Sequence, residues 1–317
     1  MKVSVVTTLY KSAPYIQEFF QRARQTILNV TEEIEFIFVD DGSPDHSSSI
    51  VRELIASEQN SQIKLAQLSR NFGHQIAIMT GLKLATGDLI FLLDVDLEEP
   101  PEIFLEMHER MMLAQRENKE PIDVVYAYQT SRKGGIFERF TGGFFYKFFN
   151  LLADVPIPMN AATVRLMTKA YVDTVVTFEE RELFLNGVFV LAGFNQVGIP
   201  FTKYSKGTST YSVMKKLSMA TRGITSFSTK PLVFIFIFGA TVSMFSIIGI
   251  LSVVARILFL QTRFDAGWPS LILAICFFGG MILAAIGVIG IYIAHVFSEV
   301  KQRPRVIKNI YSSLTRK

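Results

Sequence analysis

The stretch LIFLLDVDLEEPPE at residues 89–102 decides the fold that this sequence predicts. Its first part, Leu89–Leu93, is a continuous apolar run of strand length, and an acidic segment beginning with Asp94 follows at once. From Pro101 on, the residues have helical spacing with proline in the first turn. An apolar strand that ends in carboxylates and leads into a helix is typical of a parallel sheet that binds ligands at the carboxyl ends of its strands.

The same alternation of strands and helices runs through about the first 130 residues. The strand-like runs are apolar throughout, as in strands buried on both faces, and the segments between them have helical periodicity. The expected strands are 3–8, 34–39, 63–68, 89–93 and 122–128, and the expected helices are 15–28, 47–57, 73–86 and 101–114. This order predicts an α/β domain with a mostly parallel sheet.

The acidic residues after the strand at 89–93 predict a site for a divalent cation. Asp94, Asp96 and Glu98 are spaced by two, and in an extended segment such residues point to the same side. Mg²⁺ takes oxygen ligands, commonly one or two carboxylates together with substrate phosphates. The alternative is a solvated acidic turn before a helix N-terminus, where acidic residues are favoured in any case. The buried strand favours the metal site, whose ion would neutralise a diphosphate leaving group.

Polar residues also follow the other expected strands. Thr8, Asp40 and Ser69 stand at strand ends, and the carboxyl ends of parallel strands meet at one edge of the sheet. The Asp40 carboxylate can accept a hydrogen bond from a base or a ribose hydroxyl, although Asp and Gly at 40–43 also suit a plain turn. The sequence has neither Gly-x-x-x-x-Gly-Lys-Ser/Thr nor Gly-x-Gly-x-x-Gly, so it indicates neither a P-loop ATPase nor a Rossmann dehydrogenase.

A basic loop follows the strand expected at 122–128. Arg132 and Arg139 flank a Gly-Gly pair at 134–135. Arginine suits bidentate contact with phosphate, and the glycines allow close approach of the backbone. The alternative is a cationic surface that rests on anionic lipid. Further candidates for a phosphate contact are Arg70, Arg165 and Lys203.

Two long apolar runs, Leu232–Ala255 and Ala266–Ala294, follow the N-terminal half. Each exceeds the ~20 residues that a helix needs to cross the hydrocarbon core of a bilayer. Basic residues precede the first run and follow the second, whereas the short connection carries only Arg263 and Asp265. The positive-inside rule therefore predicts a multi-pass protein of the plasma (inner) membrane with the large domain and both termini in the cytoplasm.

Composition narrows the classes of site. The chain has one cysteine, Cys276, inside the second apolar run, and four scattered histidines, so the sequence predicts neither a disulfide framework nor a zinc site. The net charge of +4 is modest, and no nucleic-acid partner is expected. Residues 212–227 combine an apolar face with basic residues, which predicts an amphipathic helix at the membrane interface. The alternative there is an ordinary surface helix packed on the domain.

Together these segments resemble glycosyltransferases of family 2, specifically the polyprenyl-phosphate glycosyltransferases that include bactoprenol glucosyltransferases and dolichol-phosphate mannose synthases. The resemblance covers essentially the whole chain. Its motifs are VVTTLYKSAPYI at 5–16, FIFVDDGSPDHS at 36–47, LSRNFGHQIAIMTGLKLATGD at 68–88, FLLDVDLEEPPE at 91–102, SRKGGIFERF at 131–140, FYKFFN at 145–150, ITSFSTKPL at 224–232 and EVKQRP at 299–304.

The resemblance implies a GT-A fold and a nucleotide-sugar donor, most often linked to UDP. It implies inversion at the anomeric carbon in a single displacement, with the lipid phosphate oxygen as nucleophile. The residues that it assigns to the nucleotide are Thr8, Tyr10, Ser12, Asp40, Asp41, Arg70 and Asp94. Those assigned to Mg²⁺ or Mn²⁺ are Asp94, Asp96 and Glu98, and those assigned to the lipid phosphate are Arg132, Arg139 and Lys203. As catalytic residues we expect Asp94, Asp96, Arg132, Arg139 and Arg165.

The chain departs from the family pattern at several positions. Thr8 stands where relatives often have proline. Asn160 and Thr163 are neutral where relatives usually carry an acid shortly before the arginine that aligns with Arg165. A phosphate monoester has its second pKa near ~6, so its oxygen needs little help from a base. The KYSKGTSTY segment at 203–211 lacks the arginine that the family usually places before the glycine.

We therefore expect a membrane-anchored enzyme that moves one sugar, glucose by overall similarity, from UDP to undecaprenyl phosphate or a similar lipid. A separate flippase would then carry the product outward, and homo-oligomers are left open. The rivals are the same reaction with GDP-mannose, UDP-GlcNAc or a modified pentose, a processive polysaccharide synthase, a catalytically weak nucleotide-sugar scaffold, and an anchored regulatory domain. The expected parts are a GT-A domain at 1–205, amphipathic helices at 206–230, transmembrane helices at 231–260 and 269–297, and a basic cytoplasmic tail at 298–317.

Overall fold

The computed structural model describes the chain at residues 1–58, 61–117, 120–129, 161–180, 183–201, 230, 232–239, 241–242, 244–245, 248, 268–301 and 304–313. The chain divides into two compact units. The first holds the described residues up to 201 together with 304–313, and the second holds those from 230 to 301. Each unit is described by itself.

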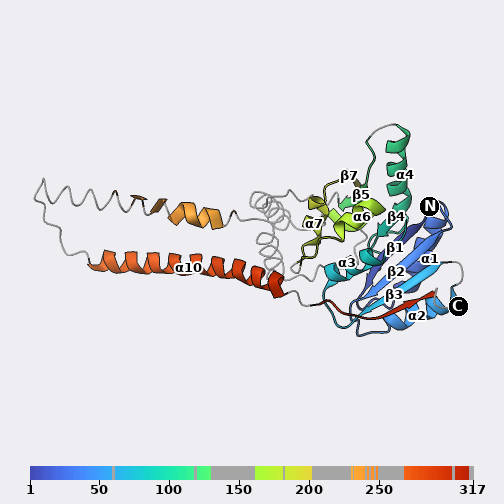
Figure 1. The fold of residues 1–317 in the computed structure, drawn as a ribbon, viewed down its shortest axis with the longest axis horizontal. Helices are drawn as coiled ribbons and strands as arrows, with labels where there is room; N and C mark the ends of the chain where they lie inside the picture. Colours follow the sequence, from blue (N-terminus) through green and yellow to red (C-terminus); the bar gives the residue numbers. More distant parts are fainter. Residues whose placement is uncertain are drawn as a thin grey trace, which may run out of the picture. The chain divides into compact units, whose positions relative to one another are not determined.

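The first unit is built on an eight-stranded sheet with the order β7-β5-β6-β4-β1-β2-β3-β8. The strands are β1 (Val3–Leu9), β2 (Ile34–Asp40), β3 (Gln62–Leu68), β4 (Leu89–Leu92), β5 (Val124–Gln129), β6 (Ala161–Thr168), β7 (Gln196–Phe201) and β8 (Ile307–Ser312). Its helices are α1 (Ile16–Leu28), α2 (Ser47–Ser57), α3 (His74–Leu84), α4 (Ile103–Arg116), α6 (Lys169–Val175) and α7 (Leu185–Leu191). Figure 1 shows β1, β2 and β3 side by side with α3 nearby.

The sheet is mostly parallel, which confirms the fold class expected from the sequence. The pairs β1–β2, β1–β4, β2–β3 and β5–β7 are parallel, whereas β6 runs antiparallel to both of its neighbours. The core strands β1, β2 and β4 are buried almost throughout, because helices cover both faces. Phe36 and Phe38 of β2 pack against Phe20 and Phe19 of α1 on one face. This burial explains why these strands are apolar throughout.

On the other face, α3 lies close to β1 and β2. Gly81 of α3 makes this approach possible, since a Cβ atom there would stand 2.5 Å from Val6 and 3.1 Å from Val39. The close packing fixes α3, and therefore its first residue, at the carboxyl end of the central strands.

Strand β8 corrects the expectation for the C-terminal segment. Residues 298–317 are not simply a basic tail, because 307–312 form an edge strand that pairs antiparallel with β3 (Figure 1). Ile63 donates its N–H to Ser313 Oγ at 3.1 Å, and the Arg52 guanidinium lies 5.7 Å from the centre of the Tyr311 ring. Arg305 donates a hydrogen bond to the Glu180 carbonyl oxygen. The described residues 304–313 are thus part of the first unit, whereas 298–301 belong to the second.

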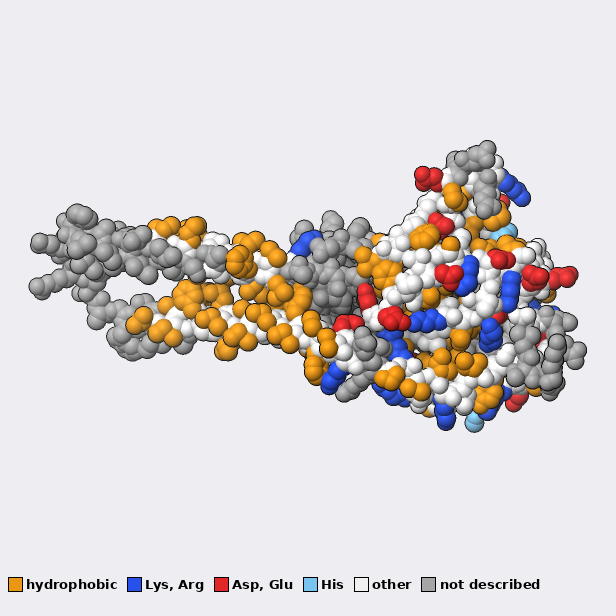
Figure 2. Space-filling model, viewed as in Figure 1, with side chains coloured by type: hydrophobic (Ala, Val, Ile, Leu, Met, Phe, Trp, Pro, Cys, Tyr) orange, Lys and Arg blue, Asp and Glu red, His pale blue; other side chains and the backbone are white. Residues whose placement is uncertain are grey.

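The second unit contains α10 (Trp268–Lys301). Its 34 residues span about 50 Å at the helical rise of 1.5 Å per residue. Hydrophobic side chains run along this helix, and large ones such as Leu283 and Ile293 are exposed (Figure 2). Among the described residues, one segment, Phe277–Lys301, is long and apolar enough to cross a membrane.

The two expected transmembrane helices are therefore not both observed. The crossing at 269–297 corresponds to α10, which extends beyond it at both ends. The crossing at 231–260 lies largely outside the described residues, and its longest described piece, 232–239, is helical. The amphipathic segment at 206–230 also lies outside the described residues, apart from Lys230.

Glu35 holds the amino ends of the central strands together. Its side chain is fully buried and accepts hydrogen bonds from Ser4 Oγ at 2.5 Å and from the Thr86 N–H at 3.0 Å. The ammonium of Lys64 lies 2.7 Å from Glu35 Oε1. Burial by itself raises the pKa of Glu35, but the bonds from Lys64, Ser4 and Thr86 outweigh it and bring the pKa to about 2.

Replacing this carboxylate tests its contribution to stability. Glu35→Gln removes one partner of a buried charge pair, which costs about 3 kcal/mol of unfolding free energy or more. Because the folded pKa lies below the ordinary value of 4.5, the stabilisation is complete above that pH and is lost as the pH falls toward about 2. Denaturant unfolding of the purified chain from pH 7 to pH 3 should show a weaker acid dependence in the variant. The control is Glu33→Gln, whose side chain is 69% exposed; an equal loss there would contradict the assignment.

Candidate active site

Three adjacent central strands bring their polar ends to one edge of the sheet. In the register of β1 and β2, Leu9 stands beside Asp40, and in that of β1 and β4, Val6 stands beside Leu92. Thr8, Asp40 and Asp94 therefore come from β1, β2 and the segment after β4 at the same edge. This placement agrees with the shared site expected at the strand ends.

Asp40 closes the turn after β2. Its Oδ1 accepts the N–H of Ser43 at 2.8 Å, and its Oδ2 accepts the hydroxyl of Ser48. Gln67 of β3 donates to the same Ser48 hydroxyl at 2.7 Å. The Asp40 side chain is thus tied into the protein, and the residue is 5% exposed. These bonds agree with the turn that the sequence allows, and the nucleotide contact of Asp40 stays a prediction.

Asp41 holds the loop between β3 and α3. Its carboxylate oxygens accept the N–H groups of Phe72 at 2.7 Å and Gly73 at 2.9 Å. Burial raises the pKa of Asp41, and these two bonds offset part of that effect. Gly42 has φ of +66°, and a Cβ there would stand 2.7 Å from the backbone of Arg70 and Asn71. The Asp41–Gly42 turn therefore packs directly on this loop.

A third carboxylate, that of Asp45, joins the loops after β1 and β2. It accepts hydrogen bonds from the hydroxyls of Ser43 and Ser47 and from the N–H of Ala13. Although burial raises its pKa, these bonds bring the pKa of Asp45 to about 2. Ser12 is 6% exposed, donates its N–H to Ser47 Oγ at 3.1 Å, and accepts the N–H of Tyr10 at the same distance. Ser12 thus shapes the loop that presents Tyr10, whose side chain is exposed.

The acidic segment after β4 does not have the expected extended geometry. The chain turns at Val95 and Asp96, and Asp96 Oδ1 accepts the N–H of Glu98 at 3.0 Å. Leu97 has φ of +60°, a left-handed conformation that reverses the chain. The alternation that would align the acids is therefore lost. Among the described residues, no group of three or more His, Cys, Asp or Glu side chains could hold a metal ion.

The donor chemistry at this turn nevertheless suits a hard cation. Asp94 and Asp96 supply carboxylate oxygens, and the Asp94 side chain is 29% exposed at the sheet edge. Mg²⁺ needs only one or two protein carboxylates when phosphates and water complete its shell. Two carboxylates with a bound diphosphate therefore remain consistent with Mg²⁺ or Mn²⁺, whereas a complete site made of protein side chains alone does not.

Arg165 is buried beside the end of β4, where the register of β4 and β6 places it opposite Leu92. It is 3% exposed in β6, and its guanidinium stands 3.7 Å from the centre of the Phe189 ring of α7. It donates to the carbonyl oxygens of Ala162 and Thr163 at 3.3 Å each. Burial lowers the pKa of Arg165 to about 10, so the side chain stays cationic at neutral pH. These contacts join β6 to α7, and the catalytic role expected for Arg165 stays a prediction.

Of the remaining residues expected at the site, the structure describes one, Arg70. Arg70 is exposed on the β3–α3 loop, with its guanidinium 4.2 Å from the centre of the Phe72 ring. Arg132, Arg139, Lys203 and Asn160 lie outside the described residues.

His74 was missed by the sequence interpretation. It is the first residue of α3, with Nδ1 3.0 Å from Thr8 Oγ1 and Nε2 3.4 Å from Asp94 Oδ1. Its position after a strand, a loop and a glycine with φ of +102° was the available signal. The sequence interpretation treated the four histidines as scattered and did not ask which of them follows a strand's carboxyl end, as His74 does.

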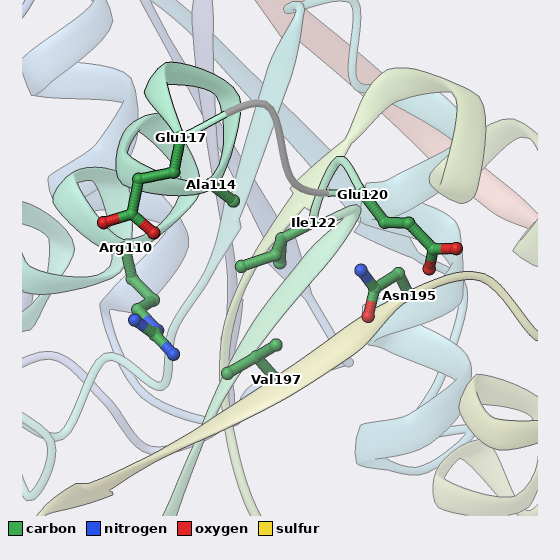
Figure 3. A pocket seen from close by; sticks show the side chains of 7 residues that line it. All are labelled: Arg110, Ala114, Glu117, Glu120, Ile122, Asn195 and Val197. Atoms are coloured by element: carbon green, nitrogen blue, oxygen red, sulfur yellow. The ribbon is translucent and has the colours of Figure 1, made fainter.

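One hollow lies away from these residues. It has a volume of about 220 Å³ and is lined in part by Arg110 of α4, by Glu117 just after that helix, and by Asn195 and Val197 (Figure 3). Asn195 directly precedes β7, which is parallel to β5, so this hollow lies at the amino ends of those strands. Ligand sites in such sheets lie at the carboxyl ends, which favours the edge with Asp94.

The comparison with known families decides the class of this fold and site. The model of glycosyl transferase family 2 matches residues 4–175. The chain belongs to glycosyl transferase family 2. The match includes β1–β4, the loops that carry Asp40 and Asp41, and the acidic turn at Asp94. The architecture is accordingly a GT-A-like α/β fold, and the enzyme class is glycosyltransferase.

Relatives match nearly the whole chain. A Mycobacterium tuberculosis protein described as "Putative glycosyltransferases" is 43% identical over 316 residues, covering 99% of this chain and 89% of its own. The bactoprenol glucosyl transferase of Shigella phage SfII is 31% identical over 313 residues, covering 97% of each. A solved mannosyltransferase from Pyrobaculum calidifontis, in complex with GDP-Man and Mn²⁺, is 13% identical with a TM-score of 0.48, covering 95% of this chain and 86% of its own.

The Asp41 contacts generate a test of the loop that carries His74. Asp41→Asn leaves one amide oxygen in place of two carboxylate oxygens, so one of the two N–H groups loses its partner. We expect a loss of about 1–3 kcal/mol of unfolding free energy and weaker nucleotide binding. Calorimetric titration with UDP and denaturant unfolding measure the two effects. Asp173→Asn, at an exposed position of α6, is the matched control, and equal UDP affinity in all three proteins would contradict the role of Asp41.

Proposed function

We propose that the protein transfers a sugar from a nucleotide-sugar to the phosphate of a polyprenyl phosphate at a membrane face. The donor proposed is UDP-glucose, and the lipid is undecaprenyl phosphate or one like it. The products are a polyprenyl-phosphate sugar and a nucleoside diphosphate. GDP-mannose, UDP-GlcNAc or a modified pentose donor would leave the reaction type unchanged.

One observation carries the proposal: the polar ends of β1, β2 and β4 meet at a single edge in a chain of glycosyl transferase family 2. Thr8 and Asp40 stand on one side of this edge, and Asp94 and Asp96 follow the neighbouring strand. The first pair suits the nucleoside, and the second suits the diphosphate. The name of the phage relative, a bactoprenol glucosyl transferase, supports glucose and a polyprenyl lipid.

The chemistry proposed is a single displacement. An oxygen of the lipid phosphate forms a bond to the anomeric carbon while the bond from that carbon to the diphosphate oxygen breaks. The electron pair leaves with the nucleoside diphosphate, and the configuration inverts. A phosphate monoester is largely ionised at neutral pH, with its second pKa near ~6, so the chain needs no strong base to activate it.

The protein's task is to hold the donor and the leaving group. Asp94 and Asp96 are the side chains that would hold Mg²⁺ or Mn²⁺, and such an ion supplies charge neutralisation for the departing diphosphate. The Asp40 and Asp45 bonds described above keep the loops after β1 and β2 rigid around the nucleoside. Arg132, Arg139 and Lys203, which lie outside the described residues, are proposed to bind the lipid phosphate.

The membrane part of the proposal rests on α10. Its segment Phe277–Lys301 is long and apolar enough to cross a membrane. We propose a multi-pass arrangement with the catalytic domain in the cytoplasm, in which the acceptor phosphate is reached from the membrane surface. A separate flippase would act on the product.

The direct test is transfer of radiolabelled sugar from a panel of UDP- and GDP-sugars to undecaprenyl phosphate in detergent. We expect a chloroform-soluble product from one donor, formed with Mn²⁺ and lost with EDTA. Product from no donor, under conditions in which the chain binds UDP, would contradict transfer and favour a nucleotide-sugar scaffold. Equal product with EDTA would contradict the metal assignment alone.

A second test separates the charge of Asp96 from its structural bond. Asp96→Asn keeps an oxygen that can accept the Glu98 N–H, so the turn is preserved while one negative charge is removed. We expect transfer to fall by about a hundredfold or more, because the diphosphate is no longer neutralised as it leaves. The rate of transfer at saturating donor measures this. Asp173→Asn serves again as the control, and an unchanged rate in Asp96→Asn would remove Asp96 from the site.

A further inference from the structure

His74 lies between two groups of the site that come from different strands. Its Nδ1 stands 3.0 Å from the hydroxyl oxygen of Thr8 at the end of β1. Its Nε2 stands 3.4 Å from Oδ1 of Asp94, after β4. One ring therefore spans from the side of the site assigned to the nucleoside to the side assigned to the diphosphate.

The backbone holds this ring in place independently of its own contacts. Asp41 accepts the N–H groups of Phe72 and Gly73, and these residues directly precede His74. Gly81, one turn before the end of α3, allows the helix to pack closely on Val6. The bonds from Asp41 hold the loop before α3, and the packing at Gly81 holds the helix near its other end. The Cα atom of His74 therefore has a fixed position, from which the imidazole reaches Thr8 and Asp94.

The chemistry of the two partners suits this bridge. A carboxylate only accepts hydrogen bonds, so Nε2 can bond Asp94 only when that nitrogen carries a proton. A threonine hydroxyl can donate or accept, so it suits Nδ1 whether or not that nitrogen carries one. The imidazole side chain is 49% exposed, so it is not an ordinary core histidine.

We propose that His74 is a positioning residue that orients the Asp94 carboxylate relative to Thr8, so that nucleoside diphosphate binding and the setting of this carboxylate are coupled. The inference rests on the proposed function, since it requires a nucleoside diphosphate at this edge. It extends that function by assigning a role to a side chain that touches neither the sugar nor the acceptor. Without the ring, Asp94 loses the contact that links its carboxylate to Thr8.

Two substitutions at position 74 separate the two halves of the bridge. An asparagine amide ends near the place of Nδ1, so His74→Asn keeps a partner for Thr8 but does not reach Asp94. A glutamine amide extends toward the place of Nε2, so His74→Gln keeps a donor for Asp94. The control is His46→Asn, because His46 is exposed, precedes α2 and makes no capping hydrogen bond with its side chain.

The measurement is calorimetric titration of UDP into the full-length protein in detergent, with EDTA and with Mn²⁺. In wild type we expect Mn²⁺ to tighten UDP binding. His74→Asn should lose about tenfold of that gain, whereas its affinity in EDTA should change by less than about twofold. His74→Gln should keep most of the gain, and His46→Asn all of it. Melting temperatures, compared among all four proteins, show whether α3 remains folded.

The outcomes distinguish the inference from the proposed function. If wild type binds neither UDP nor GDP, the proposed function fails. If wild type binds UDP more tightly with Mn²⁺ and His74→Asn does the same, the inference is overturned while the function stands. Equal weakening of His74→Asn in EDTA and in Mn²⁺ would mean that His74 contacts the nucleotide directly, which also overturns the coupling. Loss of the gain in both His74→Asn and His74→Gln would overturn the assignment of Nε2 to Asp94.

Discussion

The parallel pairing of β1 between β2 and β4 is the constraint on which the site depends. The register places Leu9 beside Asp40 and Val6 beside Leu92, so the residues that follow these strands emerge at one edge. A shift of one residue in any of these pairings would exchange the side chains that face α1 and α3 and would separate the polar groups. The close contact of Gly81 with Val6 and the buried Glu35 network stabilise the same three strands from the helix side and from their amino ends.

Much of the polarity at this edge is used to hold the loops. Asp40, Asp41 and Asp45 each accept two or more hydrogen bonds from neighbouring serines or backbone N–H groups. These bonds satisfy groups that would otherwise be buried at a cost, and they fix the chain around the pocket. His74, Asp94 and the turn at Asp96 then lie on a framework that is rigid before any ligand binds. Such preorganisation is what stabilisation of a departing diphosphate requires.

The first half of the fold was predictable because its signals are local. Strands buried on both faces are apolar throughout, and the expected strand at 34–39 and helix at 47–57 agree with β2 and α2. The edge strand β8 was not predictable in the same way, because it is mostly exposed and its partner β3 lies more than 200 residues earlier in the chain. Elements α6, α7 and β7 are short, so they show no clear hydrophobic periodicity in the sequence. Their positions depend on packing around β6.

The site was predictable at the level of strand ends and not at the level of side-chain geometry. Thr8, Asp40 and Asp94 follow from the position of each strand. The turn at Leu97 depends on backbone conformation, so the sequence suggested an extended acid array in its place. The burial of Arg165 against Phe189 depends on distant packing, which the sequence did not predict. His74 joins the site through α3, whose start is set by Asp41, a contact that links residues more than 30 positions apart.

The most direct measurement is an experimental structure of the full-length protein with bound UDP and Mn²⁺. The account predicts the nucleoside against Thr8 and Asp40, the diphosphate beside Asp94 and Asp96, and the His74 ring still between Thr8 and Asp94. A nucleotide in the hollow beside Arg110 and Asn195, or a diphosphate away from the acidic turn, would contradict it.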